Sequence, residues 1–222
     1  MLFALVQPVA FAALVVSFLL GLVLRAVAIR LTARGLGLAD RREPISPRPR
    51  ADVDPFGAVA AAIGGMGWGR MLSVDQVTRH RGRGRAAAVF AAGPLACIVV
   101  SELLLAAYAV LYSGADLRLL SPADVLSGVS GPVAQQALLS LAVGLLSFGL
   151  LALIPIPPLD GFGILWYALR RPGNGMQWMR LWFEDKNIGV LMLLVLCLFP
   201  LGSPLLLAIL DVLGLLFVRV WA

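Results

Sequence analysis

Three apolar runs, each long enough to cross a lipid bilayer, constrain this chain more than any other feature. The first covers residues 1–24, in which the only polar side chains are Gln7 and Ser17. A helix of this length rises roughly 34 Å, enough for a hydrocarbon core of about 30 Å. No lysine or arginine precedes the run, so we expect a membrane anchor and not a cleaved signal peptide. Residues 86–112 and 133–157 form the other two runs, which predicts an all-α integral membrane protein with three core transmembrane helices.

The composition supports a single membrane domain over residues 1–222. Hydrophobic residues make up 60% of the chain and charged residues only 14%, against about 25% in ordinary globular proteins. The formal net charge of +6 would suggest nucleic-acid binding in a soluble protein. In a membrane protein we expect instead that the basic loops contact anionic lipid headgroups on the cytoplasmic side, with no nucleic acid as partner. The sequence does not indicate an oligomeric state.

The basic residues are concentrated on one side of the expected spans. They cluster in residues 25–55, 70–85 and 170–187, whereas the connection 113–132 contains Arg118 as its single basic residue. Basic loops remain on the cytoplasmic side during membrane insertion. We therefore expect a multi-pass protein of the cell membrane with its N-terminus outside, the three basic loops in the cytoplasm and 113–132 as an external loop.

Two further apolar segments do not fit a simple span. Residues 56–69 are glycine-rich and short for a span, which predicts a re-entrant or interfacial element, and the loops alternate correctly only if this segment does not cross. Residues 188–218 are longer than one straight span needs and are interrupted by Pro200, Gly202 and Pro204. They form either one kinked transmembrane helix or a tight helical hairpin, so one or two C-terminal transmembrane helices complete the predicted fold.

A proline-rich stretch follows the third span and contains Pro155, Pro157, Pro158, Asp160 and Gly161. The prolines remove backbone donors and end the helix, and such a backbone survives at membrane depth only inside the protein or beside a polar cavity. An ionisable residue beyond such a break is a candidate for a functional site. The alternative is a helix stop at the membrane surface followed by an ordinary turn, and the residues alone leave both interpretations open.

Four short stretches, in this order, resemble motifs of the site-2 protease family of intramembrane zinc metalloproteases, in its compact bacterial form. Residues 155–161 look like its proline-rich motif, whose aspartate, here Asp160, is the third zinc ligand. Residues 92–96, with Gly93 and Pro94, look like its A-G-P motif. The remaining two are residues 53–57, which resemble the segment before the re-entrant region, and residues 33–37, which resemble the tail after the H-E-x-x-H helix. The resemblance implies a cavity that admits a transmembrane helix, positioned with help from the proline motif.

The chain departs from the family at the residues that carry the chemistry. The H-E-x-x-H positions fall on residues 25–29, where Arg25, Ala26 and Ile29 replace the two histidines and the glutamate. Zinc hydrolysis needs two imidazoles one helical turn apart and a carboxylate base, whereas arginine stays charged and repels a metal. Only Asp160 remains, so we expect no catalytic residues and no cofactor, with zinc only if the family activity is retained. His80 lies among arginines that oppose metal binding.

Three functions follow as hypotheses. The first is a non-proteolytic pseudoprotease that binds or regulates transmembrane partners, in which Asp160 pairs with Arg25 because a buried carboxylate needs a cationic partner. Gly93, Pro94 and the proline-rich stretch would then be a structural or helix-binding motif. The second is an active intramembrane zinc metalloprotease with unusual ligands. The third is a membrane transport component, in which Asp160 and the intramembrane acids Glu102 and Asp211 line a proton or cation path.

Overall fold

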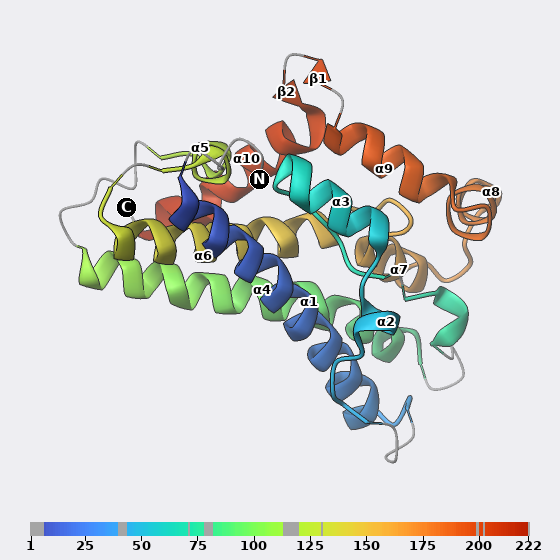
Figure 1. The fold of residues 1–222 in the computed structure, drawn as a ribbon. Helices are drawn as coiled ribbons and strands as arrows, with labels where there is room; N and C mark the ends of the chain where they lie inside the picture. The colour runs from blue at the N-terminus through green and yellow to red at the C-terminus, as the bar shows by residue number, and fades with distance from the viewer. Residues whose placement is uncertain are drawn as a thin grey trace.

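A computed structural model describes residues 7–39, 44–70, 72–77, 82–112, 120–129, 131–198, 200–201 and 203–221. The chain is helical over most of these residues (Figure 1). Three helices are long and apolar enough to cross a membrane: α1 (Pro8–Gly35), α4 (Arg83–Leu111) and α6 (Val133–Leu153). The predicted helical fold with three helices of spanning length is confirmed. His80 lies outside the described residues.

The three long helices pack against one another, with α4 and α6 side by side and α1 across them (Figure 1). Small residues allow this close approach. A methyl group at Gly149 of α6 would lie 2.9 Å from the Pro94 carbonyl oxygen of α4, and one at Gly144 would overlap Ser17 of α1. The Ser101 hydroxyl of α4 donates a hydrogen bond of 2.7 Å to the Ala142 carbonyl of α6. Backbone contact and interhelical hydrogen bonds hold helices together where no water drives their association.

Two of the long helices differ from their sequence-based bounds. Helix α1 does not end at Leu24, where the apolar run ends, but continues through the first part of the expected loop to Gly35. Helix α4 was expected to be interrupted at Gly93 and Pro94, yet it runs through both. A proline removes one hydrogen bond from a helix, and neighbouring helices can compensate for that loss in a packed bundle.

The third long helix ends before the prolines instead of including them. Helix α6 stops at Leu153, and α7 (Asp160–Ala168) starts after a non-helical link. Turn-like backbone hydrogen bonds of 2.8 Å, from Ile156 to the Ile154 carbonyl and from Leu159 to the Ile156 carbonyl, hold the link. Its second half, from Pro157 to Asp160, is buried in the protein. Burial explains how a backbone with missing donors is tolerated here.

The segment expected to be re-entrant forms a short helix and a return. Helix α2 (Pro49–Asp52) precedes α3 (Pro55–Gly64), whose first turn is capped by Asp54, which accepts a hydrogen bond of 2.8 Å from the Phe56 amide. The chain then returns, and Val53 and Gly69 pair as an isolated antiparallel bridge. The two ends of the segment therefore meet. Whether it dips into a membrane stays a prediction.

The remaining elements are short. Helix α5 (Pro122–Ser127) begins with the Ser121 cap that the sequence indicates, completed by Asp124 as a capping box. The others, in chain order, are η2 (Val74–Gln76), α8 (Asn174–Met179), the π-helical η5 (Arg180–Asp185), α9 (Ile188–Leu198), β1 (Pro200–Leu201), β2 (Ser203–Pro204), α10 (Leu205–Val218) and η6 (Arg219–Trp221). The run 188–218 is thus two helices with a two-residue antiparallel strand pair between them. How often it crosses a membrane stays open.

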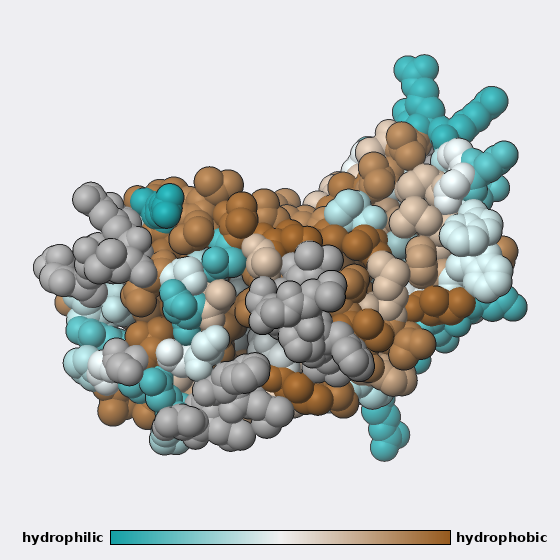
Figure 2. All heavy atoms as spheres, turned by 90° about the horizontal axis from the view of Figure 1, so that it is seen from above, coloured by the Kyte–Doolittle hydropathy of each residue, from teal (hydrophilic) through white to brown (hydrophobic). Residues whose placement is uncertain are grey.

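The surface is apolar in its middle and hydrophilic at one end. Seen from above in Figure 2, hydrophobic side chains cover the centre of this face, and strongly hydrophilic side chains project on the right, the end where α8 lies in Figure 1. Exposed large apolar residues include Val99, Leu103 and Val110 of α4. Such a distribution suits a helical bundle whose flanks face lipid.

Candidate functional site

The centre of the candidate site is an ion pair between Arg25 of α1 and Asp160, the first residue of α7. Arg25 Nε donates to Asp160 Oδ2 at 2.6 Å, and Nη2 donates to Oδ1 at 2.5 Å. The two residues are only 7% and 3% exposed. The pair that the sequence predicts is therefore present, in the bidentate geometry that matches a guanidinium to a carboxylate.

The stretches that the family resemblance assigns to one site meet around this pair. Arg25 and Ile29 lie one turn apart on the same side of α1, and Gly93 of α4 faces both. A methyl group at Gly93 would lie 2.7 Å from Arg25 Cγ and 3.3 Å from Ile29 Cδ1. Ala26 is buried beside them, with 5% exposure. Positions from α1, α4 and α7 thus converge, and glycine at position 93 leaves room for the arginine side chain.

The proline-rich link fixes where Asp160 lies. Gly161 follows it, and a methyl group at this glycine would overlap the carbonyl oxygens of Leu153 and Ile154 at the end of α6. The first turn of α7 therefore lies against the last turn of α6. Pro155 is exposed, whereas Pro157 and Pro158 are buried. The link acts as a rigid corner that turns the Asp160 carboxylate toward α1.

These residues do not fit a zinc ion. Among the described residues, no three histidine, cysteine, aspartate or glutamate side chains lie close enough to share a metal. Both Asp160 oxygens accept hydrogen bonds from Arg25, whose permanent positive charge opposes a cation. The buried Cys97 thiol donates to the Gly21 carbonyl, 3.6 Å away. The donor set needed for a zinc site is missing from this part of the chain.

The other intramembrane acids each have a partner elsewhere. Glu102 of α4 accepts a hydrogen bond of 2.8 Å from Trp221 Nε1. Asp211 of α10 accepts one of 2.9 Å from the Ala123 amide, in the first turn of α5. No hydrogen bond joins either side chain to Asp160 among the described residues. The structure provides no connected row of carboxylates.

Sequence reasoning missed a polar cavity beside the ion pair. The cavity, with a volume of about 860 Å³, lies between the second half of α1 and the segments around α2 and η2. Arg30 of α1 pairs with Asp52 of α2 at 2.5 Å and thereby ties this loop to α1. On another wall, the Tyr167 hydroxyl lies 2.5 Å from the Val74 carbonyl and 2.7 Å from the Val77 carbonyl. The arginine-rich composition of the loop was visible in the sequence, but its folding back onto α1 was not.

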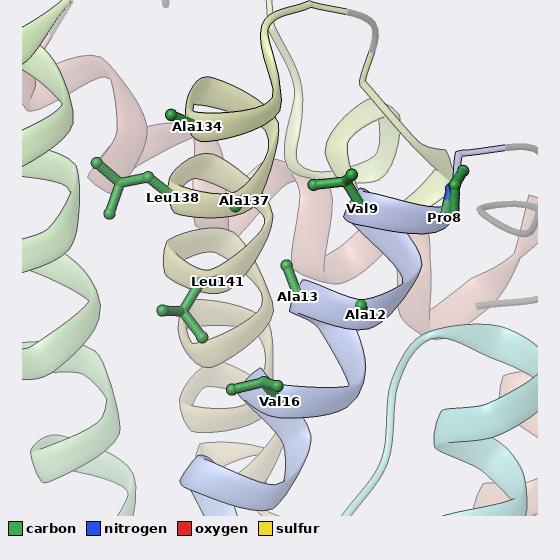
Figure 3. A pocket seen from close by; sticks show the side chains of 9 residues that line it. All are labelled: Pro8, Val9, Ala12, Ala13, Val16, Ala134, Ala137, Leu138 and Leu141. Carbon is green, nitrogen blue, oxygen red and sulfur yellow. The ribbon is translucent and has the colours of Figure 1, made fainter.

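A second hollow, of about 660 Å³, lies between the first turns of α1 and the first turns of α6 (Figure 3). We call it the α1–α6 groove. All of its lining residues are apolar: Pro8, Val9, Ala12, Ala13 and Val16 from α1, and Ala134, Ala137, Leu138 and Leu141 from α6. Four alanines among nine residues leave both helix backbones accessible. The groove lies within two helices of spanning length, away from the Arg25–Asp160 pair.

Comparison with known proteins gives one informative match. The chain is 30% identical over 168 residues to the protein named "Putative zinc metalloprotease YwhC" of Bacillus subtilis (strain 168). The match covers 74% of this chain and 69% of that protein. No protein-family model matches the chain, and no solved structure matches it. On the identity and coverage of this match, the chain belongs to the metalloprotease family of YwhC.

Proposed function

We propose that this protein is a site-2-protease-like membrane protein that binds a transmembrane helix of a membrane partner and does not cleave it. The observation that carries the proposal is the buried Arg25–Asp160 ion pair. It lies where the resemblance assigns the zinc site, and it uses the one ligand-type residue that remains there. Retention of the surrounding glycines and prolines supports a scaffold that still serves binding.

The ion pair is incompatible with the chemistry of the family name. A guanidinium is not deprotonated in a protein, so Arg25 cannot be a ligand, and its charge occupies the space near the carboxylate. Ala26 has no group that accepts a proton from water, and Ile29 has no donor atom for a metal. Removing either partner of the pair would leave an uncompensated buried charge, which is why the pair itself is stable.

The α1–α6 groove is the surface proposed to hold the partner (Figure 3). An occupant at this depth must be apolar, because the groove has no polar side chain to satisfy a polar group. Alanines on both helices permit the backbone of a third helix to approach closely, which is how transmembrane helices associate. We therefore propose an apolar transmembrane helix as the occupant.

The membrane orientation is part of the same proposal. The three long apolar helices support a multi-pass protein. The basic loops would face the cytoplasm, where they contact anionic headgroups, and the N-terminus would lie outside. Cysteine-accessibility labelling in intact cells tests this orientation: an introduced cysteine at the exposed Arg170 should react only after the membrane is permeabilised.

Photo-crosslinking tests the helix-binding function. A photoreactive amino acid replaces Ala137 in the groove, and the matched control replaces Val110, which is 81% exposed on the apolar face of α4. We expect a discrete adduct with an intact membrane protein from position 137 only, and its loss when Ala13→Phe fills the groove. Equal adducts from both positions, or persistence of the adduct in the filled variant, would contradict the proposal.

The second candidate function is an active zinc metalloprotease, which the name of the relative favours. Metal content separates the two. We expect no bound zinc in the detergent-purified chain or in its Asp160→Ala variant. Near-stoichiometric zinc in the wild type that is lost from the variant would favour the protease and overturn the pseudoenzyme.

A further inference from the structure

The cavity beside Arg25 has an excess of positive charge after its ion pairs are counted. Four arginines line it, Arg25, Arg30, Arg48 and Arg70, together with the single acid Asp52. Arg25 is neutralised by Asp160 and Arg30 by Asp52. Among the described residues, no carboxylate pairs with Arg48 or Arg70. The cavity therefore presents two uncompensated positive charges.

These two arginines also have hydrogen-bond donors to spare. The Arg48 guanidinium forms no hydrogen bond with any described residue, and Arg70 uses only Nη1, which donates to the Arg50 carbonyl at 3.0 Å. Their backbones, in contrast, are held in place. The Arg48 amide donates to Asp52 Oδ2 at 2.6 Å, and the Arg70 carbonyl accepts from Arg25 Nη1 at 3.0 Å. Anchored backbones with free guanidinium forks suit a tetrahedral oxyanion.

The position of the cavity along α1 gives its depth in the membrane, provided that α1 crosses it as proposed above. The uncharged part of α1 ends at Arg25. Arg30 follows five residues later, about 7.5 Å further along the helix axis. The headgroup layer occupies roughly 5–7 Å on each side of the hydrocarbon core. The arginines therefore lie at the depth of the lipid phosphates.

The rest of the lining is apolar, which favours an amphiphile over a small soluble anion. Ala33, Leu38 and Leu72 face the same cavity. A lipid would place its phosphate between the arginines and its glycerol and first acyl carbons against these side chains. A free phosphate ion would leave the apolar wall uncovered.

We infer that this cavity binds the phosphate group of an anionic lipid headgroup, with Arg48 and Arg70 as its direct ligands. The site is separate from the α1–α6 groove, and it requires neither a transmembrane partner nor proteolysis. Basic pockets next to transmembrane helices on the cytoplasmic side are suited to anionic headgroups.

Native mass spectrometry of the full chain, released from nanodiscs that contain phosphatidylglycerol and phosphatidylcholine, tests the inference. The test variant is Arg48→Gln/Arg70→Gln, and the matched control is Arg170→Gln/Arg171→Gln, which removes the same charge from two exposed residues outside the cavity. We expect one phosphatidylglycerol retained by the wild type and the control. Binding to the test variant should be weaker by about tenfold, the loss of one good charge-assisted contact.

Two further measurements make the outcome decisive. Thermal unfolding establishes that the test variant is folded, and an unchanged midpoint assigns the lost lipid to the site itself. Calorimetric titration with inorganic phosphate distinguishes the source of the anion, because saturable phosphate binding without lipid retention would overturn the lipid assignment. Equal loss in both double variants, or no loss in either, would overturn the site.

Discussion

The guanidinium of Arg25 forms a buried bidentate ion pair with the carboxylate of Asp160, 135 residues further along the chain. The pair joins the middle of α1 to the first turn of α7. Both side chains are removed from water, so each depends on the other for compensation of its charge. This dependence leads to the first prediction.

Removing one partner of the pair should cost far more than removing both. We expect Asp160→Asn to lower the free energy of unfolding by about 3–5 kcal/mol, because Arg25 would remain buried without a counter-charge. The double variant Arg25→Met/Asp160→Leu should recover most of this loss. The partly exposed pair of Arg30 with Asp52 is the control, and Arg30→Gln should cost about 1 kcal/mol or less. Denaturant titration in mixed micelles measures all three, and equal losses for the single and the double variant would contradict the prediction.

Restoring the missing donors should create a zinc site. Positions 25 and 29 face Gly93 together, and Asp160 already reaches position 25. We expect the variant Arg25→His/Ala26→Glu/Ile29→His to bind about one zinc ion per chain, since two imidazoles at i and i+4 and a carboxylate form a tetrahedral ligand set with an open position. Elemental analysis measures the metal. Adding Asp160→Ala should abolish binding, and zinc retained without this carboxylate would refute the predicted geometry.

Gly161 should tolerate no side chain. A methyl group there would overlap backbone carbonyls of Leu153 and Ile154, which cannot move without displacing the end of α6. We expect Gly161→Ala to destabilise the protein by about 1–3 kcal/mol or more. Gly84, in the first turn of α4, has nothing within 4 Å of such a methyl group. The control Gly84→Ala should be neutral or stabilise by about 0.5–1 kcal/mol, because alanine favours a helix. Unfolding of both variants in the same detergent checks the contrast.

The Tyr167 hydroxyl should hold the segment around η2 against α7. It lies within hydrogen-bond distance of the Val74 and Val77 carbonyls, so Tyr167→Phe leaves both without this donor at a cost of about 1 kcal/mol. Amide hydrogen exchange should accelerate in residues 72–77. The hydroxyl of Tyr112 has no hydrogen-bond partner among the described residues, so Tyr112→Phe should leave exchange in this segment unchanged. Equal exchange in the wild type and the Tyr167 variant would contradict the assigned role.

Much of the architecture follows from the sequence because membrane solubility imposes local rules. Three uncharged runs of spanning length become the three long helices. Serine before proline starts α5, and the proline-rich stretch ends α6. The exact ends are less local. Residues 25–35 are polar enough to resemble a loop, yet they continue α1 because Arg25 and Arg30 find acidic partners on other elements.

The site shows the same division. The replacement of histidine and glutamate by Arg25, Ala26 and Ile29, and the survival of Asp160, are properties of the sequence, and they already predicted an ion pair in place of a metal. Only the tertiary structure decided the rest. It brought the loop that carries Arg48 and Arg70 back onto α1, where it encloses a cavity with two unpaired positive charges. Side-chain periodicity reports which face of one helix is buried, but the position of a loop depends on long-range ion pairs such as Arg30 with Asp52. Contacts between residues far apart in the chain leave no local pattern from which they could be predicted.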